Sequence, residues 1–144
     1  MNEHDLEDLC FEWLDDIGIE CVLGDQLSPG SDNAEREHYS DVVLRQRLHD
    51  ALTRLNANSP TAEVEEAHAK LCAYASQSIV DGNKELYDWL RNGVPVDRRD
   101  ADGTQTVHRL MVISPNGEND FLATRQFTIM GDKPRRPDVI IFVN

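Results

Sequence analysis

The chain has 144 residues, of which 28% are charged and 40% hydrophobic, and its formal net charge is −13. This length suits one domain, or part of one, with a hydrophobic core, and the composition is typical of a folded soluble protein. No apolar stretch is long enough to cross a bilayer, and the acidic first twenty residues do not resemble a signal peptide. Three cysteines without a CxxC spacing favour a reducing compartment. We therefore expect a cytoplasmic protein with no membrane partner.

The acidic residues are concentrated at the N-terminal end. Residues 1–50 hold 14 acidic against 3 basic residues, whereas residues 101–144 hold 5 of each. Because neutralising phosphates requires Lys and Arg at the contact surface, nucleic acid is expected to bind at the C-terminal third and not at the acidic front. The basic residues there that could make this contact are Arg125, Lys133, Arg135 and Arg136.

The N-terminal half is predicted to be helical. Apolar residues repeat at helical spacing over 5–17, and Gly18 favours the end of that helix. Glu7 lies at the border of the apolar stripe, so it does not point fully into solvent. The stripe, expected to be buried, comprises Leu6, Leu9, Cys10, Trp13, Leu14 and Ile17. Trp13, Trp89 and Tyr74 are interpreted as core or half-core aromatics.

Three further helices are predicted after a short strand over 19–23 and a polar loop over 24–37. The first runs from about Asp41 to Leu55. The second follows Ser59 and Pro60, which suit an N-cap and a first turn, and the third is expected to be capped by Asn83. The predicted buried face of the second helix comprises Val64, Ala67, Leu71 and Ala75.

From Gly93 onward the apolar residues alternate, which predicts strands. A strand from Val94, a hairpin turn over 100–103, a return strand over 106–113 and a strand over 121–129 are expected in that order. Helices over 1–92 and strands over 93–144 predict a mixed α/β or α+β domain.

The last segment combines an aspartate with an apolar strand. Val139 to Val143 are all apolar, which predicts a central strand covered on both faces. Asp138 stands at its head, where sheet-based enzymes often place a metal ligand, but an aspartate after a proline is also a common turn residue. On the residues alone both interpretations stay open, and Arg135 and Arg136 also suit an ordinary solvated turn.

Several stretches, spread over nearly the whole chain, resemble the N-terminal part of the restriction (R) subunit of type I restriction-modification enzymes. Three of them are Leu6-Glu7 with its helix, 39–44 with the Leu-rich helix to Asn56, and 100–103. The more specific ones are 119–123 with 126–128, and Arg135-Arg136-Pro137-Asp138 with 141–144.

This resemblance implies a nuclease domain of the PD-(D/E)xK type, with a restriction-endonuclease-like mixed sheet preceded by a helical N-terminal half. Asp138 matches the family's catalytic, metal-binding aspartate, and Glu7 matches a glutamate that often joins the site from the first helix. The acid-x-Lys triplet of the next strand is absent from the sequence. We therefore expect residues 1–144 to be the N-terminal part of one endonuclease domain, truncated before the last core strand and inactive alone.

The resemblance also implies a cofactor and partners. Magnesium suits an all-oxygen site at Asp138, with Glu7 holding a metal-bound water, while Arg135, Arg136 and Lys133 would contact the DNA backbone. The complete subunit would be a type I site-specific deoxyribonuclease that binds ATP in downstream motor domains, translocates, and works with methylation and specificity subunits.

Two other interpretations remain open. The acidic front suits a protein-docking module or a mimic of DNA phosphates without catalysis. Alternatively, the chain is a fragment with no cellular role of its own. In that case the apolar edge over 138–143 is expected to pair two copies into a homodimer, or to be disordered.

Overall fold

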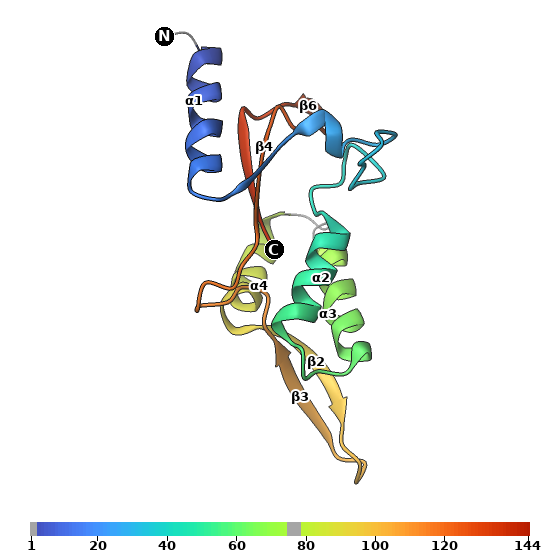
Figure 1. Ribbon diagram of the computed structural model, residues 1–144. Helices are drawn as coiled ribbons and strands as arrows, with labels where there is room; N and C mark the ends of the chain where they lie inside the picture. Colours follow the sequence, from blue (N-terminus) through green and yellow to red (C-terminus); the bar gives the residue numbers. More distant parts are fainter. Residues whose placement is uncertain (1–2, 75–78) are drawn as a thin grey trace. The chain divides into compact units, whose positions relative to one another are not determined.

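The computed structural model describes residues 3–74 and 79–144, which form two compact units (Figure 1). Unit 1 consists of Met1–Leu44 and Asp120–Val143, and unit 2 consists of Arg45–Asn119 with Asn144. Within the described part of the chain there are four α-helices and a small mixed sheet, so the predicted mixed α/β class is confirmed. None of the described helices has the length and apolar character required to cross a membrane.

A three-stranded sheet is the centre of unit 1. Its strands are β1 (Glu20–Leu23), β4 (Phe121–Arg125) and β7 (Val139–Val143), in the order β1-β4-β7. β1 is parallel to β4, and β7 is antiparallel to it. Leu23 pairs with Arg125, which pairs with Val139, so the ends of β1 and β4 meet the start of β7 at one edge of the sheet.

One face of this sheet carries the core of unit 1. Leu122 of β4 packs with Leu27, Leu44 and Phe127, and all four side chains are buried. Ile140 and Phe142 of β7 pack against this cluster. The rings of Phe127 and Phe142 meet edge to face with centroids 5.3 Å apart, a favourable aromatic geometry.

The final strand is not the doubly covered central strand that its five apolar residues predicted. Among the described strands β7 pairs with β4 alone, and its burial alternates. Ile140 and Phe142 face the core, while Ile141 and Val143 on the other face are 45% and 42% exposed. An apolar run therefore indicated a strand correctly, but it did not report how many of its faces are covered.

The N-terminal helix α1 (Glu3–Asp16) is confirmed. It ends in a Schellman motif, in which Ile19 N donates to Leu14 O at 3.0 Å and Gly18 N donates to Asp15 O at 2.8 Å. Gly18 has φ 85°, a conformation that glycine adopts at no steric cost. The predicted stripe is confirmed only in part, because the sheet covers a different face of the helix. Leu9, Cys10 and Leu14 are half-buried, whereas the core position of Trp13 is wrong. Leu6, Trp13 and Ile17 are 56%, 60% and 73% exposed.

The strand predicted over 121–129 is interrupted after Arg125. Gln126 has φ 57°, which turns the chain out of the sheet. A separate two-stranded ribbon follows, with β5 (Ile129–Met130) antiparallel to β6 (Pro134–Arg135). The predicted polar loop begins with a 3-10 helix, η1 (Gly24–Leu27), and carries buried residues at Leu27, Ser28 and Arg36.

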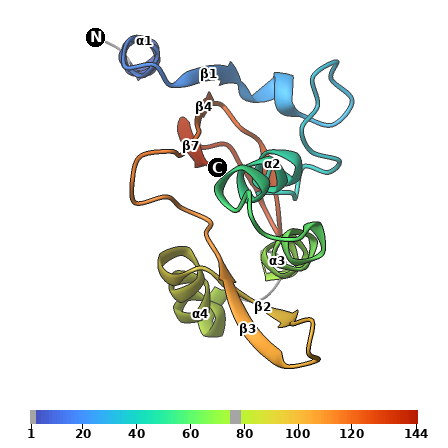
Figure 2. The same ribbon diagram turned by 60° about the horizontal axis from the view of Figure 1, so that its bottom comes forward.

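Unit 2 combines three helices with a hairpin (Figure 2). α2 (Arg45–Leu55) packs against α3 (Thr61–Tyr74), which contacts the hairpin of β2 (Val94–Arg99) and β3 (Gln105–Leu110). The hairpin is antiparallel and turns at Gly103, whose φ is 85°, as predicted. α4 (Ile79–Asn92) also contacts β2.

The helices of unit 2 confirm most of their predicted positions. α3 buries Val64, Ala67 and Leu71 as expected, whereas Ala75 lies outside the described residues. α2 begins at Arg45 and not at Asp41. α4 begins four residues before Asn83, so Asn83 does not cap it. Trp89 is buried and Tyr74 packs against it, with ring centroids 5.1 Å apart.

Candidate functional site

Asp138 lies at the edge of the unit 1 sheet where three strand ends meet. It immediately precedes β7, and its side chain is exposed. Its carbonyl oxygen accepts a hydrogen bond of 3.2 Å from Gln126 N, so the head of β7 is fixed to the end of β4. The carboxylate is therefore held by rigid backbone while it remains open to solvent.

The chain is packed closely behind this edge. A Cβ on Gly24 would lie 2.7 Å from Phe127 Cα, 2.8 Å from Gln126 O and 2.9 Å from Arg125 O. Only glycine allows this approach without a backbone shift, because all three neighbours are main-chain atoms. Gly24, at the start of η1, thus packs against residues 125–127, and Gln126 of this segment anchors Asp138.

The basic residues predicted to bind DNA belong to the segment between β4 and β7. Arg136 donates from Nε to Gln126 O at 3.3 Å and from NH2 to Gln126 Oε1 at 3.0 Å. Arg135 lies in β6, opposite Ile129, and Lys133 lies in the turn before it. All three side chains are exposed. Arg136 is therefore bonded to Gln126, the residue that also anchors Asp138, while Arg135 and Lys133 extend the positive charge along the ribbon.

Helix α1 is joined to the same sheet edge through Arg125. The Arg125 guanidinium pairs with Asp8, and it also lies 5.2 Å from the centroid of the Phe11 ring. The hydrogen bond from Arg125 holds the pKa of Asp8 below its ordinary value. Since Arg125 pairs with Val139 in the sheet, this contact brings α1 toward the head of β7.

Glu7 precedes Asp8 on α1 and is half-buried, as its border position predicted. Its Oε2 is buried and has no hydrogen-bond partner. A buried carboxylate oxygen without a partner is costly, and such atoms occur where a ligand, water or ion completes the site. The structure records no hydrogen bond or ion pair that joins Glu7 to Asp138 within the described ranges.

The donors available here are carboxylate oxygens, which suit Mg²⁺ because this ion often binds through one or two carboxylates and keeps several waters. Asp138 and Glu7 fit such a role by the chemistry of their carboxylate oxygens, and helix α1, which carries Glu7, contacts the sheet at β1 and β4. Over residues 3–74 and 79–144, no group of three or more His, Cys, Asp and Glu side chains is placed to hold a metal ion. Any ion here would therefore be held by two carboxylates at most from these residues.

Arg36 is a structural residue that the sequence analysis missed. It is 5% exposed, and its guanidinium carbon lies 3.7 Å from the centroid of the Phe127 ring. It donates to Ser28 Oγ at 3.3 Å and to Tyr39 O at 3.4 Å. Burial lowers its pKa. The loop before α2 is thereby fixed to Phe127, the core residue that follows Gln126. Gln126 is the residue whose N–H group anchors Asp138.

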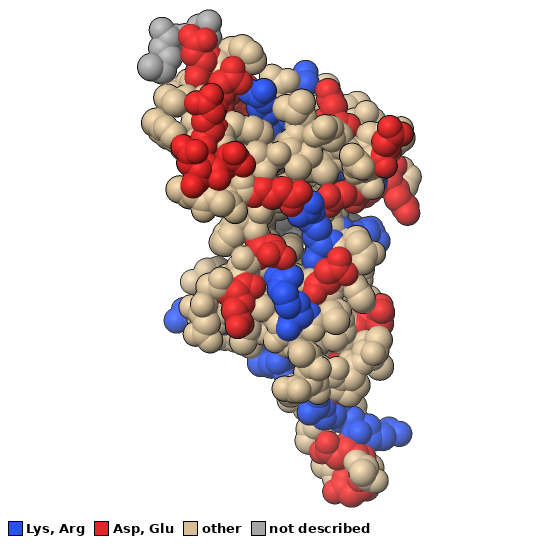
Figure 3. Space-filling view, viewed as in Figure 1, with Lys and Arg blue, Asp and Glu red and all other residues tan. Residues whose placement is uncertain are grey.

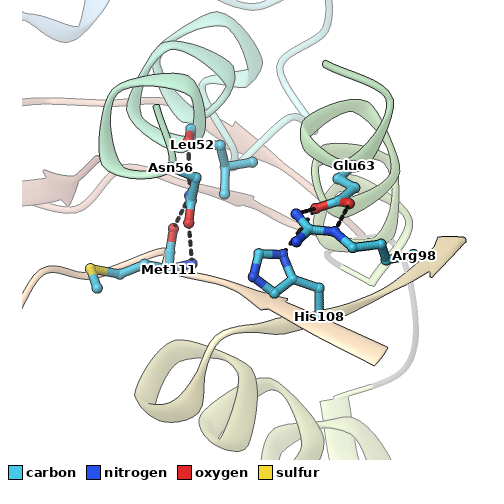
Figure 4. A network of polar contacts seen from close by, with 6 residues as sticks. All are labelled: Leu52, Asn56, Glu63, Arg98, His108 and Met111. Carbon is cyan, nitrogen blue, oxygen red and sulfur yellow. Dashed lines mark hydrogen bonds and ion pairs between the residues drawn. The ribbon is translucent and has the colours of Figure 1, made fainter. Parts of the chain in front are cut away.

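Unit 2 contains a buried carboxylate with an arginine and a histidine as neighbours (Figure 4). Glu63 is 5% exposed and accepts two hydrogen bonds from Arg98, at 2.6 Å and 2.9 Å. His108 Nδ1 lies 3.0 Å from Glu63 Oε2. The hydrogen bonds from Arg98, with a smaller contribution from His108, hold the pKa of Glu63 below its ordinary value. Because Arg98 and His108 already satisfy this carboxylate, the network joins α3 to the hairpin and is structural.

A second polar contact in the same unit joins α2 to the end of β3. Asn56 Nδ2 donates to Leu52 O and to Met111 O, and Met111 N donates to Asn56 Oδ1, each at 2.8 Å. The amide therefore satisfies groups of both segments (Figure 4).

The architecture defines a class, namely a mixed α/β domain with an exposed aspartate at the head of one strand of a small mixed sheet. The chain belongs to the family described as type I restriction enzyme R protein N terminus (HSDR_N), whose model matches residues 1–144. The resemblance noted from the sequence is thus confirmed.

Two relatives match this chain over part of their own length. The type I restriction enzyme HindI endonuclease subunit of Haemophilus influenzae is 31% identical over 148 residues, which cover 100% of this chain and 14% of the relative. The putative type I restriction enzyme MjaIXP endonuclease subunit of Methanocaldococcus jannaschii is 27% identical over 150 residues, which cover 96% of this chain and 14% of the relative. The chain thus spans 14% of the length of either relative. No solved structure matches the chain.

Proposed function

We propose that this chain is part of the metal-dependent endonuclease domain of a type I restriction subunit, and that Asp138 is its metal ligand. The observation that carries the proposal is the position of Asp138, exposed and anchored where the ends of β1 and β4 meet the start of β7. Membership of the R-subunit family supports the same assignment. The restriction-endonuclease-like fold is part of this proposal.

Asp138 would hold Mg²⁺ directly, and Glu7 would hold a water bound to that ion. When bound, the ion offsets the negative charge that develops on the phosphate oxygens and makes a bound water more acidic. The buried, unpartnered Oε2 of Glu7 supports its role, since a water bound to a cation would supply the missing hydrogen-bond donor. The Asp8–Arg125 pair positions the helix that carries Glu7.

Arg136 and Arg135 would bind the DNA backbone beside Asp138, and Lys133 would extend that contact. Arginine recognises phosphate through two parallel N–H groups, whereas lysine acts as a point charge. Arg136 is oriented by Gln126, so its guanidinium is already ordered before DNA binds.

In the intact enzyme, cleavage would be coupled to ATP-driven translocation in a complex with methylation and specificity subunits. The names of the two relatives as endonuclease subunits of type I restriction enzymes support this assembly. The chain's own residues would contribute the nuclease site, and ATP would bind elsewhere in the subunit.

The test is DNA cleavage by the intact restriction subunit with its partner subunits, ATP and Mg²⁺, beside its Asp138→Ala variant. We expect cleavage to fall by at least a hundredfold while ATP hydrolysis is unchanged, because only the nuclease site loses its ligand. Asp132→Ala is the matched control, since Asp132 is an exposed aspartate in the neighbouring β5–β6 turn.

Equal cleavage by Asp138→Ala and the wild type would make Asp138 a turn residue and overturn the nuclease assignment. The acidic docking module would then be the better account of the region. Glu7→Gln tests the role of Glu7 separately from that of Asp138. It should raise the Mg²⁺ concentration needed for half-maximal cleavage and leave DNA binding unchanged.

A further inference from the structure

Helix α1 presents an apolar seam that unit 1 does not cover. Leu6 and Trp13 of α1 and Ile17, the residue that follows the helix, continue one row at helical spacing and are 56%, 60% and 73% exposed. With Cys10, which is half-buried, their spacing is four, three and four residues. That alternation is the pattern by which one helix packs against another through interlocking side chains.

The seam is distinct from the face that carries the proposed nuclease site. Phe11 and Asp8 contact Arg125 of the sheet, and Glu7 and Leu14 lie beside them on the same half of the helix. At 100° per residue, the row of Leu6, Trp13 and Ile17 is turned about 130° from this packed face. Binding at the seam therefore does not require the contacts that position Glu7.

The charge beside the seam restricts its partner. Asp5, Glu12 and Asp16 form a second row with the same spacing, one residue behind the apolar row, and all three are exposed. The helix Glu3–Asp16 contains seven acidic residues and no Lys or Arg. Figure 3 shows acidic side chains gathered over α1. A second copy of α1 would bring like charges together, whereas a helix with basic borders would neutralise them.

We propose that α1 docks an amphipathic helix whose apolar face covers Leu6, Trp13 and Ile17 and whose basic residues face Asp5, Glu12 and Asp16. Trp13 is the anchor of this surface, since large aromatic side chains contribute most to such contacts. The acidic row sets the orientation and the partner, because charges at the border of an interface act mainly on specificity and association rate.

The test places a photoreactive benzoylphenylalanine at position 13 (Trp13→benzoylphenylalanine) of the intact restriction subunit, assembled with its partner subunits. After irradiation, mass spectrometry identifies the cross-linked segment. We expect one dominant cross-link, to a helical segment with Lys or Arg beside its apolar residues. No cross-link, or a cross-link to another α1 or to a segment without basic residues, would overturn the proposal.

Charge reversal provides an independent readout. In the subunit that carries benzoylphenylalanine, Glu12→Lys with Asp16→Lys should lower the cross-linking yield at least tenfold. In the same subunit without these two changes, raising the salt concentration should also lower the cross-linking yield. Asp32→Lys with Glu37→Lys is the matched control, because both residues are exposed acids of unit 1 that lie outside α1. Equal losses in both double variants would show that total charge, and not this surface, controls the contact. Unchanged DNA cleavage in a complex with intact Asp138 would separate this result from the nuclease proposal.

Discussion

At the scale of single residues, unit 2 depends on one buried carboxylate. Glu63 is almost fully removed from solvent, which would be costly for an unpaired charge. Arg98 offsets that cost with two hydrogen bonds, and His108 approaches the second carboxylate oxygen. Because the carboxylate accepts hydrogen bonds, His108 Nδ1 carries the proton in this contact.

Replacing Glu63 with glutamine should therefore destabilise the protein. Glutamine keeps the shape but loses the charge that the Arg98 guanidinium faces, and we expect a loss of about 2 kcal/mol in the free energy of unfolding. Urea unfolding followed by circular dichroism measures it. Glu85→Gln, an exposed residue of α4, should change the free energy by less than about 0.5 kcal/mol. Equal effects at the two positions would contradict the structural role of Glu63.

The same carboxylate predicts how stability depends on pH. The pKa of Glu63 is lower in the folded protein than its ordinary value of 4.5, so the unfolded chain binds its proton first as the pH falls. The contribution of Glu63 is thus fully present above about pH 4.5 and is lost as the pH falls through the folded pKa. The difference in unfolding free energy between wild type and Glu63→Gln should shrink from pH 7 to pH 3. A constant difference would show that the pKa of Glu63 is the same in the folded and unfolded states.

The contacts of Arg36 depend on the shape of its side chain and not only on its charge. Its planar guanidinium stacks on Phe127 and donates to two oxygens, which a lysine ammonium cannot reproduce. We expect Arg36→Lys to lower the free energy of unfolding by about 1–2 kcal/mol, although the charge is retained. Arg135→Lys is the comparison in the same unit, and because Arg135 is exposed its unfolding curve should match that of the wild type.

These residue-scale contacts could not be predicted from the sequence. Asp8 and Arg125 are 117 positions apart, and Glu63 is 35 positions from Arg98 and 45 from His108. No local pattern links such pairs, because only the fold brings them together. The position of Asp138 at the head of a strand was predictable, since Pro137 and the apolar run after it are adjacent in the sequence.

At the scale of elements, the contact between η1 and the end of β4 leaves no room for a side chain at Gly24. Gly24→Ala would place a Cβ within 3.0 Å of three main-chain atoms, and at least one backbone segment would have to move. We expect a loss of about 2–3 kcal/mol in unfolding free energy, in the upper range of overpacking substitutions. Gly131→Ala is the control, because a Cβ there meets nothing within 4 Å. A thermal unfolding midpoint for Gly24→Ala equal to that of Gly131→Ala would contradict this close packing.

The elements themselves were largely predictable where the signal was local. Gly18 and Gly103 marked the end of α1 and the turn of the β2–β3 hairpin, because each adopts a positive φ that other residues avoid. The β5–β6 ribbon was missed, since strands of two residues are too short to show an alternating pattern. The exposed seam of α1 was missed for another reason. Periodicity identifies an apolar face, but it does not report which surface covers that face.

At the scale of the whole molecule, the chain order and the two compact units do not coincide. Unit 1 is assembled from Met1–Leu44 and Asp120–Val143, so the acidic helix and the basic β5–β6 segment belong to one unit although they lie at opposite ends of the sequence. Unit 2 is almost entirely the continuous segment Arg45–Asn119. That both units together form part of one endonuclease domain remains a prediction.

The continuity of unit 2 predicts that it folds alone. Its helices and hairpin are held by contacts within Arg45–Asn119, including the Glu63 network and the Asn56 contact to Met111. A chain of residues 45–119 should therefore show helical circular dichroism and cooperative urea unfolding, with low stability because few residues form its core. Glu63→Gln should destabilise this segment by the same amount as in the full chain, because its partners lie within the segment. A non-cooperative transition, or a segment insensitive to Glu63→Gln, would show that unit 2 needs unit 1 to fold.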